Sequence, residues 1–161
     1  MISENKEGKL YNRGFDKQGH AILYMKPALE TSQNFDSNIK HLVFCVEMAI
    51  KSMEEAGRGA EKILIILDYK DWGLSKATPL KTALECNNIL GNHYPERLFK
   101  AILLNTPFLF SVFWGAISPF VDPVTKAKML MMRQSPLETV KSTLAGALSR
   151  LNVTWNSCIT K

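Results

Sequence analysis

The stretch Ile63-Leu64-Ile65-Ile66-Leu67-Asp68 decides the fold class of this chain. It follows a charged turn and is an unbroken apolar run that ends in an acid. Such a short, uniformly apolar run is typical of a strand covered on both faces of a sheet, because a surface helix would carry polar residues on one side. We therefore predict a buried central strand with Asp68 at its carboxyl end, where we expect this acid to cap the following loop.

A helix and a second buried strand follow this run. Thr78-Pro79 predicts a helix with Thr78 as its cap and Pro79 at the first helical position, running to about Asn92. The run Ala101-Ile102-Leu103-Leu104-Asn105 then repeats the strand pattern. Strand, helix and strand in this order predict a βαβ unit, in which the two strands are parallel neighbours joined by a right-handed crossover.

Two elements are expected before the central strand. The apolar run Ala21–Met25, between a turn and Lys26-Pro27, is predicted to be the first strand. From Phe35 onward, apolar residues recur at spacings of three and four, which predicts an amphipathic helix of about five turns. The candidate caps of this helix are Asp36, Ser37 or Asn38 at its start and Gly57 at its end.

Residues 101–121 carry no charge, so a membrane-spanning helix has to be considered. Asn105, Pro107 and Pro119 interrupt the stretch, and its first residues already fit a buried strand. We therefore interpret residues 108–117 as a separate helix that is apolar on every side. Such a helix is either fully buried or lies against an apolar partner.

The last forty residues hold most of the net charge of +5, with 6 basic and 2 acidic side chains in residues 122–161. This asymmetry is compatible with a solvated basic face, or with a lipid or nucleic-acid surface as partner. Asp122-Pro123 predicts a helix start, with Asp122 as cap. Met129-Leu130-Met131-Met132 can form a further strand, and residues 136–151 a terminal helix.

Composition argues for one globular domain in a reducing compartment. The chain has 161 residues, and its three cysteines include no CxxC pair. The first residues are charged and lack an apolar stretch, so no secretory signal is expected. The three histidines are too scattered for a metal site, and His41 is expected at the surface.

Enzymatic and nucleic-acid functions find little support. His93 could be drawn into a triad with Asp68 and either Cys86 or Ser75, but no GxSxG elbow or catalytic cysteine context surrounds them. No phosphate-binding loop precedes Asp68. The aromatic residues cluster in an uncharged stretch rather than between basic residues, which disfavours nucleic-acid binding.

Six segments occur in a specific order. The block His93-Tyr94-Pro95-Glu96-Arg97-Leu98 is followed, after a strand, by Asn105-Thr106-Pro107-Phe108 and then by Pro119-Phe120-Val121-Asp122-Pro123-Val124-Thr125-Lys126-Ala127-Lys128. Upstream lie Gly14-Phe15-Asp16-Lys17-Gln18-Gly19, Tyr24-Met25-Lys26-Pro27 and Ile66-Leu67-Asp68. Over residues 10–132 this set resembles the CRAL-TRIO lipid-binding domain of the Sec14-like proteins.

The resemblance implies an α/β domain in which a mixed, mostly parallel sheet floors a hydrophobic cavity for one lipid. It also implies a mobile gate helix at about residues 108–120, and a headgroup site formed by Glu96 and Lys128. We expect Ile63, Ile65, Leu67, Ala101 and Leu103 to line the cavity. The expected gate residues, some of which should touch the membrane, are Phe108, Phe110, Phe113 and Trp114.

This chain also departs from the family pattern. Ile63 and Ile65 stand where the fungal transfer proteins have hydroxyl residues that contact phosphatidylcholine, which makes that ligand doubtful here. The helical subdomain that usually precedes the fold is not expected. We divide the chain into an extension at 1–9, the lipid-binding domain at 10–132, and a segment at 133–161 that does not follow the family ending.

The expected function is binding of a single lipid, most plausibly phosphatidylinositol, and its transfer or presentation between membranes. The protein is expected to be a cytoplasmic monomer that associates transiently with membranes and has no enzymatic activity, cofactor or metal. The alternative is a lipid-sensing or protein-docking module that binds a neutral hydrophobic ligand without transferring it.

Overall fold

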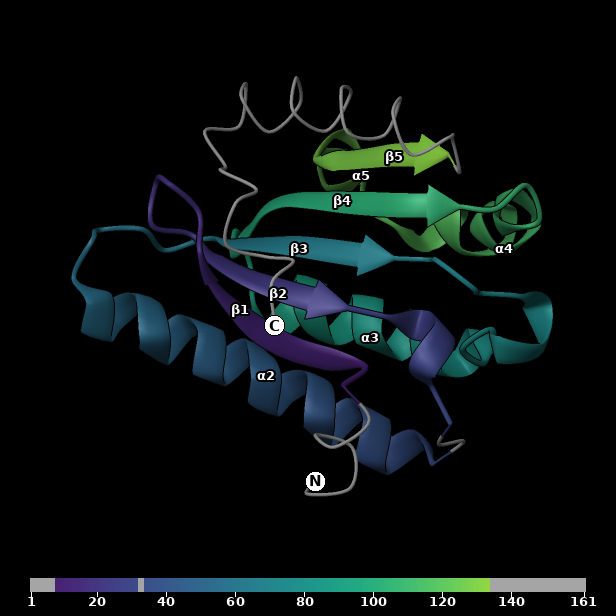
Figure 1. Cartoon of the computed structure of the whole chain (residues 1–161), viewed down its shortest axis with the longest axis horizontal. Coiled ribbons are helices and arrows are strands. Elements are labelled where there is room, and N and C mark those ends of the chain that lie inside the picture. The colour runs from purple at the N-terminus through teal and green to yellow at the C-terminus, as the bar shows by residue number, and fades with distance from the viewer. Residues whose placement is uncertain (1–7, 32–33, 134–161) are drawn as a thin grey trace.

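The computed structural model describes residues 8–31 and 34–133, and within them five strands form one sheet (Figure 1). The strands lie in the order β1-β2-β3-β4-β5, with β1 antiparallel to β2 and all other neighbours parallel. The predicted mixed, mostly parallel α/β sheet is confirmed. The strand bounds are β1 Leu10–Phe15, β2 Ala21–Met25, β3 Ile63–Asp68, β4 Leu98–Thr106 and β5 Met129–Arg133.

The predicted strand–helix–strand unit consists of β3, α3 (Leu80–His93) and β4. Ile65 pairs with Ala101 and Leu67 with Leu103 in parallel register. β4 begins at Leu98, three residues before the predicted start, because Leu98 pairs with Ile63 across an irregularity in the ladder. The apolar pattern alone had located only the fully buried part of this strand.

Both faces of β3 are buried, as its uniform apolar sequence requires. On one face Ile63 packs with Leu23 of β2 and with the inner side of α2 (Phe35–Ala56). On the other face Leu64 and Ile66 pack with residues of β2 and β4. α3 lies on the same face of the sheet as α2, because Cys86 and Leu90 contact the same apolar cluster (Figure 1).

Asp68 joins the carboxyl ends of three strands. Its Oδ2 accepts a hydrogen bond from the Tyr24 hydroxyl at 2.8 Å, and its Oδ1 accepts from the Asn105 amide at 2.8 Å and from the Lys70 backbone N–H at 3.0 Å. The last bond confirms that Asp68 caps the following loop. Burial, reinforced by the bond to Asp68, raises the pKa of Tyr24 well above its ordinary value, so the hydroxyl keeps the proton that it donates.

β1 is an edge strand that the apolar pattern of the sequence does not predict. β1 precedes the run that was predicted as the first strand, and it carries Asn12, Arg13 and Gly14 in its middle. Only Leu10 of β1 is buried, and Asn12 and Gly14 are exposed, so the strand lacks the apolar alternation that would have predicted it. Asn12 donates its amide to the Cys45 carbonyl at 3.2 Å, which attaches β1 to α2.

Two of the predicted caps are correct and two are not. Gly57 ends α2 in the left-handed conformation, and Asp122 caps α5 (Pro123–Ala127). The N-cap of α2 is Asn34, whose side chain accepts from the Ser37 N–H, so the three residues proposed for that role lie within the first turn. α3 begins one residue later than predicted, with Pro79 itself in the extended cap position and no capping side chain.

His41 is buried, contrary to the expectation that it lies at the surface. It is 1% exposed because position 41 falls on the inner stripe of α2, one helical turn before Cys45.

Within residues 8–31 and 34–133 no helix has the length and apolar character needed to cross a membrane. The helix predicted over 136–151 lies outside the described residues.

Replacing Leu64 by alanine should lower the free energy of unfolding by about 2 to 5 kcal/mol, because this side chain is completely buried in the middle of the sheet. The matched control is Leu80→Ala at the exposed start of α3, which should cost less than about 1 kcal/mol. Urea unfolding followed by circular dichroism measures both. Equal losses would contradict the two-sided burial of β3.

Candidate functional site

An open cavity of about 640 Å³ lies on the helical face of the sheet. Its volume falls in the range that is typical of small-molecule sites. The apolar part of its lining includes Leu23, Val46, Ile63, Ile65, Leu90 and Leu98. The rim includes polar and charged side chains from α3, from the turn before β4 and from α5, namely Asn87, Asn88, Asn92, Glu96, Arg97, Asp122, Thr125 and Lys128.

A tight turn places Glu96 at this rim. The Arg97 N–H donates to the Tyr94 carbonyl at 3.2 Å, and Pro95 between them favours such a turn. Glu96 adopts a φ of 58°, in the left-handed region that favours glycine or asparagine. The side chain of Glu96 is thus presented to solvent at some cost in backbone strain.

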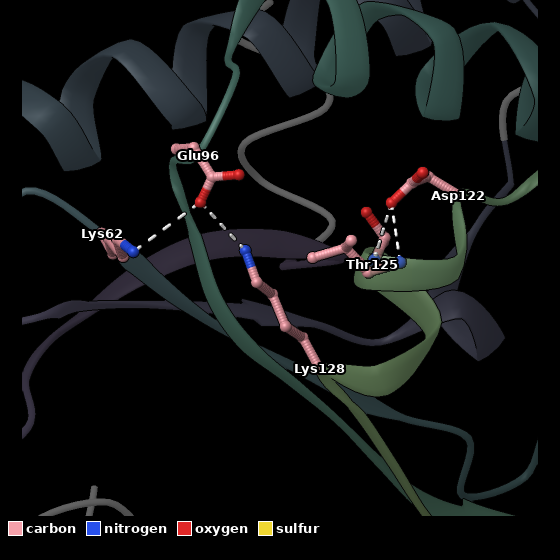
Figure 2. A network of polar contacts seen from close by, with 6 residues as sticks. Lys62, Glu96, Asp122, Thr125 and Lys128 are labelled. Atoms are coloured by element: carbon pink, nitrogen blue, oxygen red, sulfur yellow. Dashed lines mark hydrogen bonds and ion pairs between the residues drawn. The ribbon is translucent and has the colours of Figure 1, made fainter.

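Two lysines approach the Glu96 carboxylate (Figure 2). Lys128 Nζ lies 3.3 Å and Lys62 Nζ lies 3.8 Å from the same Oε2 atom. The Glu96 side chain is 74% exposed, whereas Lys128 is 23% exposed. An exposed ion pair is worth at most about 1 kcal/mol, so Glu96 orients Lys128 only weakly. Lys128 can therefore exchange the Glu96 carboxylate for another anion at little cost in free energy.

The position of Lys128 depends on α5. Asp122 Oδ1 accepts hydrogen bonds from the N–H groups of Val124 and Thr125, at 2.8 and 3.1 Å, and so fixes the start of this short helix (Figure 2). At its end, the Lys128 carbonyl accepts from the Ala101 N–H of β4 at 3.0 Å. The helix is therefore tied to the sheet directly beneath the cavity rim.

The predicted site residues fall into two places. Glu96, Lys128, Ile63 and Ile65 meet at the cavity. The other predicted cavity residues lie farther along the same sheet face, where they pack with aromatic side chains rather than line this hollow. This second cluster contains Leu67, Ala101, Leu103, Tyr69, Trp72, Phe110, Phe113 and Trp114.

The predicted gate segment forms α4 (Phe110–Ile117) and a short 3-10 turn, Ser118–Phe120. Phe110 is 4% exposed and packs on Tyr69, with ring centroids 4.5 Å apart. Phe113 and Trp114 are half-buried, whereas Phe108 is 80% exposed. The helix is therefore buried on one side only, and Phe108, Leu109, Val112 and Phe120 remain exposed.

Several cavity residues were not foreseen. Leu23 and Val46 come from β2 and α2, and they reach the cavity because parallel pairing sets Leu23 beside Ile65. The rim asparagines lie on α3 and carry no recognisable motif. Lys62 pairs with Glu96 beside the cavity without lining it, and the sequence marks it only as part of the charged turn before the central strand.

The geometry gives no catalytic centre that matches the triad considered from the sequence. Asp68 is occupied by Tyr24, Asn105 and the Lys70 N–H. Burial raises the pKa of the free Cys86 thiol to about 11, which makes it a poor nucleophile at neutral pH. Among the described residues, no group of three or more His, Cys, Asp or Glu side chains is placed to hold a metal ion.

Comparisons with known proteins identify the family of the chain. The family model described as "CRAL/TRIO domain" matches residues 5–145. The chain is 36% identical over 132 residues to the phosphatidylinositol transfer protein PDR17 of Saccharomyces cerevisiae, covering 79% of this chain and 37% of that protein. It is also 36% identical over 103 residues to the SEC14 cytosolic factor of Kluyveromyces lactis, covering 60% of this chain and 34% of that protein.

A solved structure shows the same fold. The crystal structure of Sfh5 superposes with a TM-score of 0.53 at 17% identity, covering 78% of this chain and 47% of that one. The chain spans less than half the length of each of these three proteins. On the family match over most of its length and on the shared fold, the chain belongs to the CRAL/TRIO family of lipid-binding domains.

Proposed function

We propose that this protein binds one phosphatidylinositol molecule in the cavity and transfers or presents it between membranes. The observation that carries the proposal is an apolar floor lying directly beneath a cationic rim, formed by Ile63 and Ile65 below Lys128. This arrangement suits an amphiphile with an anionic head. A similar protein that carries the name phosphatidylinositol transfer protein supports the same ligand.

The two parts of the site bind different parts of the lipid. Acyl chains lie against the floor, where each methylene removed from water is worth about 0.8 kcal/mol. The Lys128 ammonium donates to the phosphate, and Glu96 holds and orients that lysine before the lipid arrives. The protein releases the lipid unchanged, so no catalysis, cofactor or metal is part of this proposal.

The α4 region provides the contact with the membrane. Apolar surface is exposed at Phe108 and Leu109, just before α4, and at Val112 within it. The other side of α4 packs in the aromatic cluster. Aromatic side chains partition well to the interface of a bilayer. Movement of α4, with Phe110, Phe113 and Trp114, away from Tyr69 and Trp72 opens the lipid-binding unit, which we place in residues 10–132.

The proposed place of action is the cytoplasm, which the name of a relative, SEC14 cytosolic factor, supports. The protein acts there as a monomer that touches membranes transiently. One observation favours a second candidate function. Glu96 already neutralises part of the positive charge at the rim, so a neutral hydrophobic ligand also fits the site. In that case the domain senses a lipid or docks a protein without transferring phosphatidylinositol.

The protein should take up one lipid per chain from vesicles that contain phosphatidylinositol and phosphatidylcholine. Native mass spectrometry after removal of the vesicles gives both the stoichiometry and the identity of the lipid. Phosphatidylinositol should dominate even where it is the minor vesicle component. A protein that stays empty with every lipid tested would overturn both candidate functions, whereas a neutral lipid would favour the second.

Lys128→Ala should weaken phosphatidylinositol uptake by about 10- to 150-fold, because a charge-assisted hydrogen bond to the phosphate is worth about 1.5 to 3 kcal/mol. Competition between labelled phosphatidylinositol and a labelled sterol measures the selectivity. Lys126→Ala, on the same helix but outside the cavity lining, is the matched control and should change neither ligand. An equal loss for both ligands in Lys128→Ala would assign that lysine to the fold.

The double variant Phe108→Ala/Val112→Ala should slow lipid transfer between vesicles by roughly tenfold, because two exposed apolar anchors are lost at about 1 kcal/mol or more in total. A fluorescence dequenching assay measures the rate. The control is Phe44→Ala/Met48→Ala, which removes two other exposed apolar groups, 38% and 41% exposed, from α2. If both variants slow transfer equally, the proposed membrane contact of α4 is wrong.

A further inference from the structure

We propose that Lys62 is a second headgroup-binding residue, and that Lys62 and Lys128 together bind one phosphate of an anionic lipid. This inference rests on the proposed function and extends it to a residue outside the matched sequence motifs. Lys62 Nζ lies 3.8 Å from Glu96 Oε2, the same oxygen that Lys128 approaches at 3.3 Å. Figure 2 shows the Glu96 carboxylate between the two lysines.

The fold fixes Lys62 at this place. The N–H of Ile63, the next residue, donates to the Arg97 carbonyl at 2.7 Å, so the starts of β3 and β4 are joined beside Glu96. The pair Lys62–Glu96 therefore links residues 34 positions apart in the sequence. It is a product of the parallel sheet and not of local helix geometry.

The two lysines beside Glu96 carry more positive charge than this single carboxylate neutralises. Lys62 and Lys128 both pair with Glu96, and within residues 8–31 and 34–133 no other carboxylate lies within 4 Å of either ammonium group. Asp122 Oδ1 is engaged by two backbone N–H groups of α5. Two ammonium groups thus share a single carboxylate that is itself largely exposed to water. An anion that reaches this rim adds the charge that the site lacks.

The spacing suits a phosphate. From their distances to Glu96 Oε2, the two Nζ atoms are no more than about 7 Å apart. A tetrahedral phosphate presents its oxygens in different directions, and each accepts a charge-assisted bond at about 2.7 to 2.9 Å. One phosphate can therefore accept from both lysines while Glu96 turns toward solvent. In this view Glu96 keeps both ammonium groups in position until the headgroup arrives.

The decisive experiment compares Lys62→Ala with Lys51→Ala. Lys51 pairs with Glu55 at 3.8 Å on α2, so this control removes an ion pair of the same length that does not involve Glu96 or a residue of the cavity lining. Uptake is measured from vesicles holding labelled phosphatidylinositol together with a labelled neutral sterol. We expect phosphatidylinositol uptake to fall about fivefold in Lys62→Ala, since the site is partly exposed, with sterol uptake and thermal stability unchanged. Lys51→Ala should behave as wild type, and Lys62→Arg should retain most of the uptake.

A second measurement separates a lipid headgroup from free phosphate. Inorganic phosphate is titrated into the lipid-free protein, and the amide NMR signals of Ile63 and Arg97 are followed. Headgroup binding predicts that phosphate shifts these signals weakly in wild type and less still in Lys62→Ala. Signals that saturate equally in both proteins would overturn the role of Lys62.

The outcomes distinguish this inference from the proposed function. If Lys128→Ala loses phosphatidylinositol uptake and Lys62→Ala does not, the function stands and the role of Lys62 is refuted. If wild type takes up no phospholipid, the proposed function fails, and the phosphate titration still decides whether Lys62 binds the anion. A fall in thermal stability with proportional losses of both ligands would show that Lys62 only supports the fold.

Discussion

The whole structure depends on the burial of β3 on both faces. Leu64 and Ile66 fill one side, and Ile63 and Ile65 face the helices on the other. A strand with no polar side chain before its final acid cannot lie at a sheet edge in water, so parallel partners must flank it. The parallel pairing in turn requires a crossover helix, and α3 supplies it. The cavity is the space that these elements leave above the start of β3.

The two ends of the sheet serve different purposes. At the carboxyl end, Asp68 binds groups from β2, β4 and the following loop, and this polar network holds the strands together. Ligands of open α/β sheets commonly bind at that end. Here the cavity instead has its charged rim at the amino end, where Glu96 precedes β4 and Lys128 precedes β5. The carboxyl end therefore holds a structural acid, and the chemistry of the site lies with the lysines.

Glu96 illustrates how a strained position can serve binding. A glycine or asparagine would suit its left-handed backbone better, and the ion pairs that it makes are too exposed to repay much strain. What its position achieves is the gathering of two ammonium groups at the mouth of an apolar cavity. This arrangement suits the proposed exchange of the Glu96 carboxylate for the phosphate of a lipid headgroup.

The sequence by itself determined the elements whose patterns are local. Apolar periodicity located α2, β3 and the buried part of β4, and the family motif singled out Glu96 and Lys128. Only the tertiary structure decided that Leu67, Ala101 and Leu103 pack against aromatic rings while Ile63 and Ile65 line the cavity. It also decided that Lys62 lies beside Glu96. The physical reason is that periodicity follows from neighbours along the chain, whereas these contacts depend on the register of parallel strands and on where α4 and α5 return to the sheet.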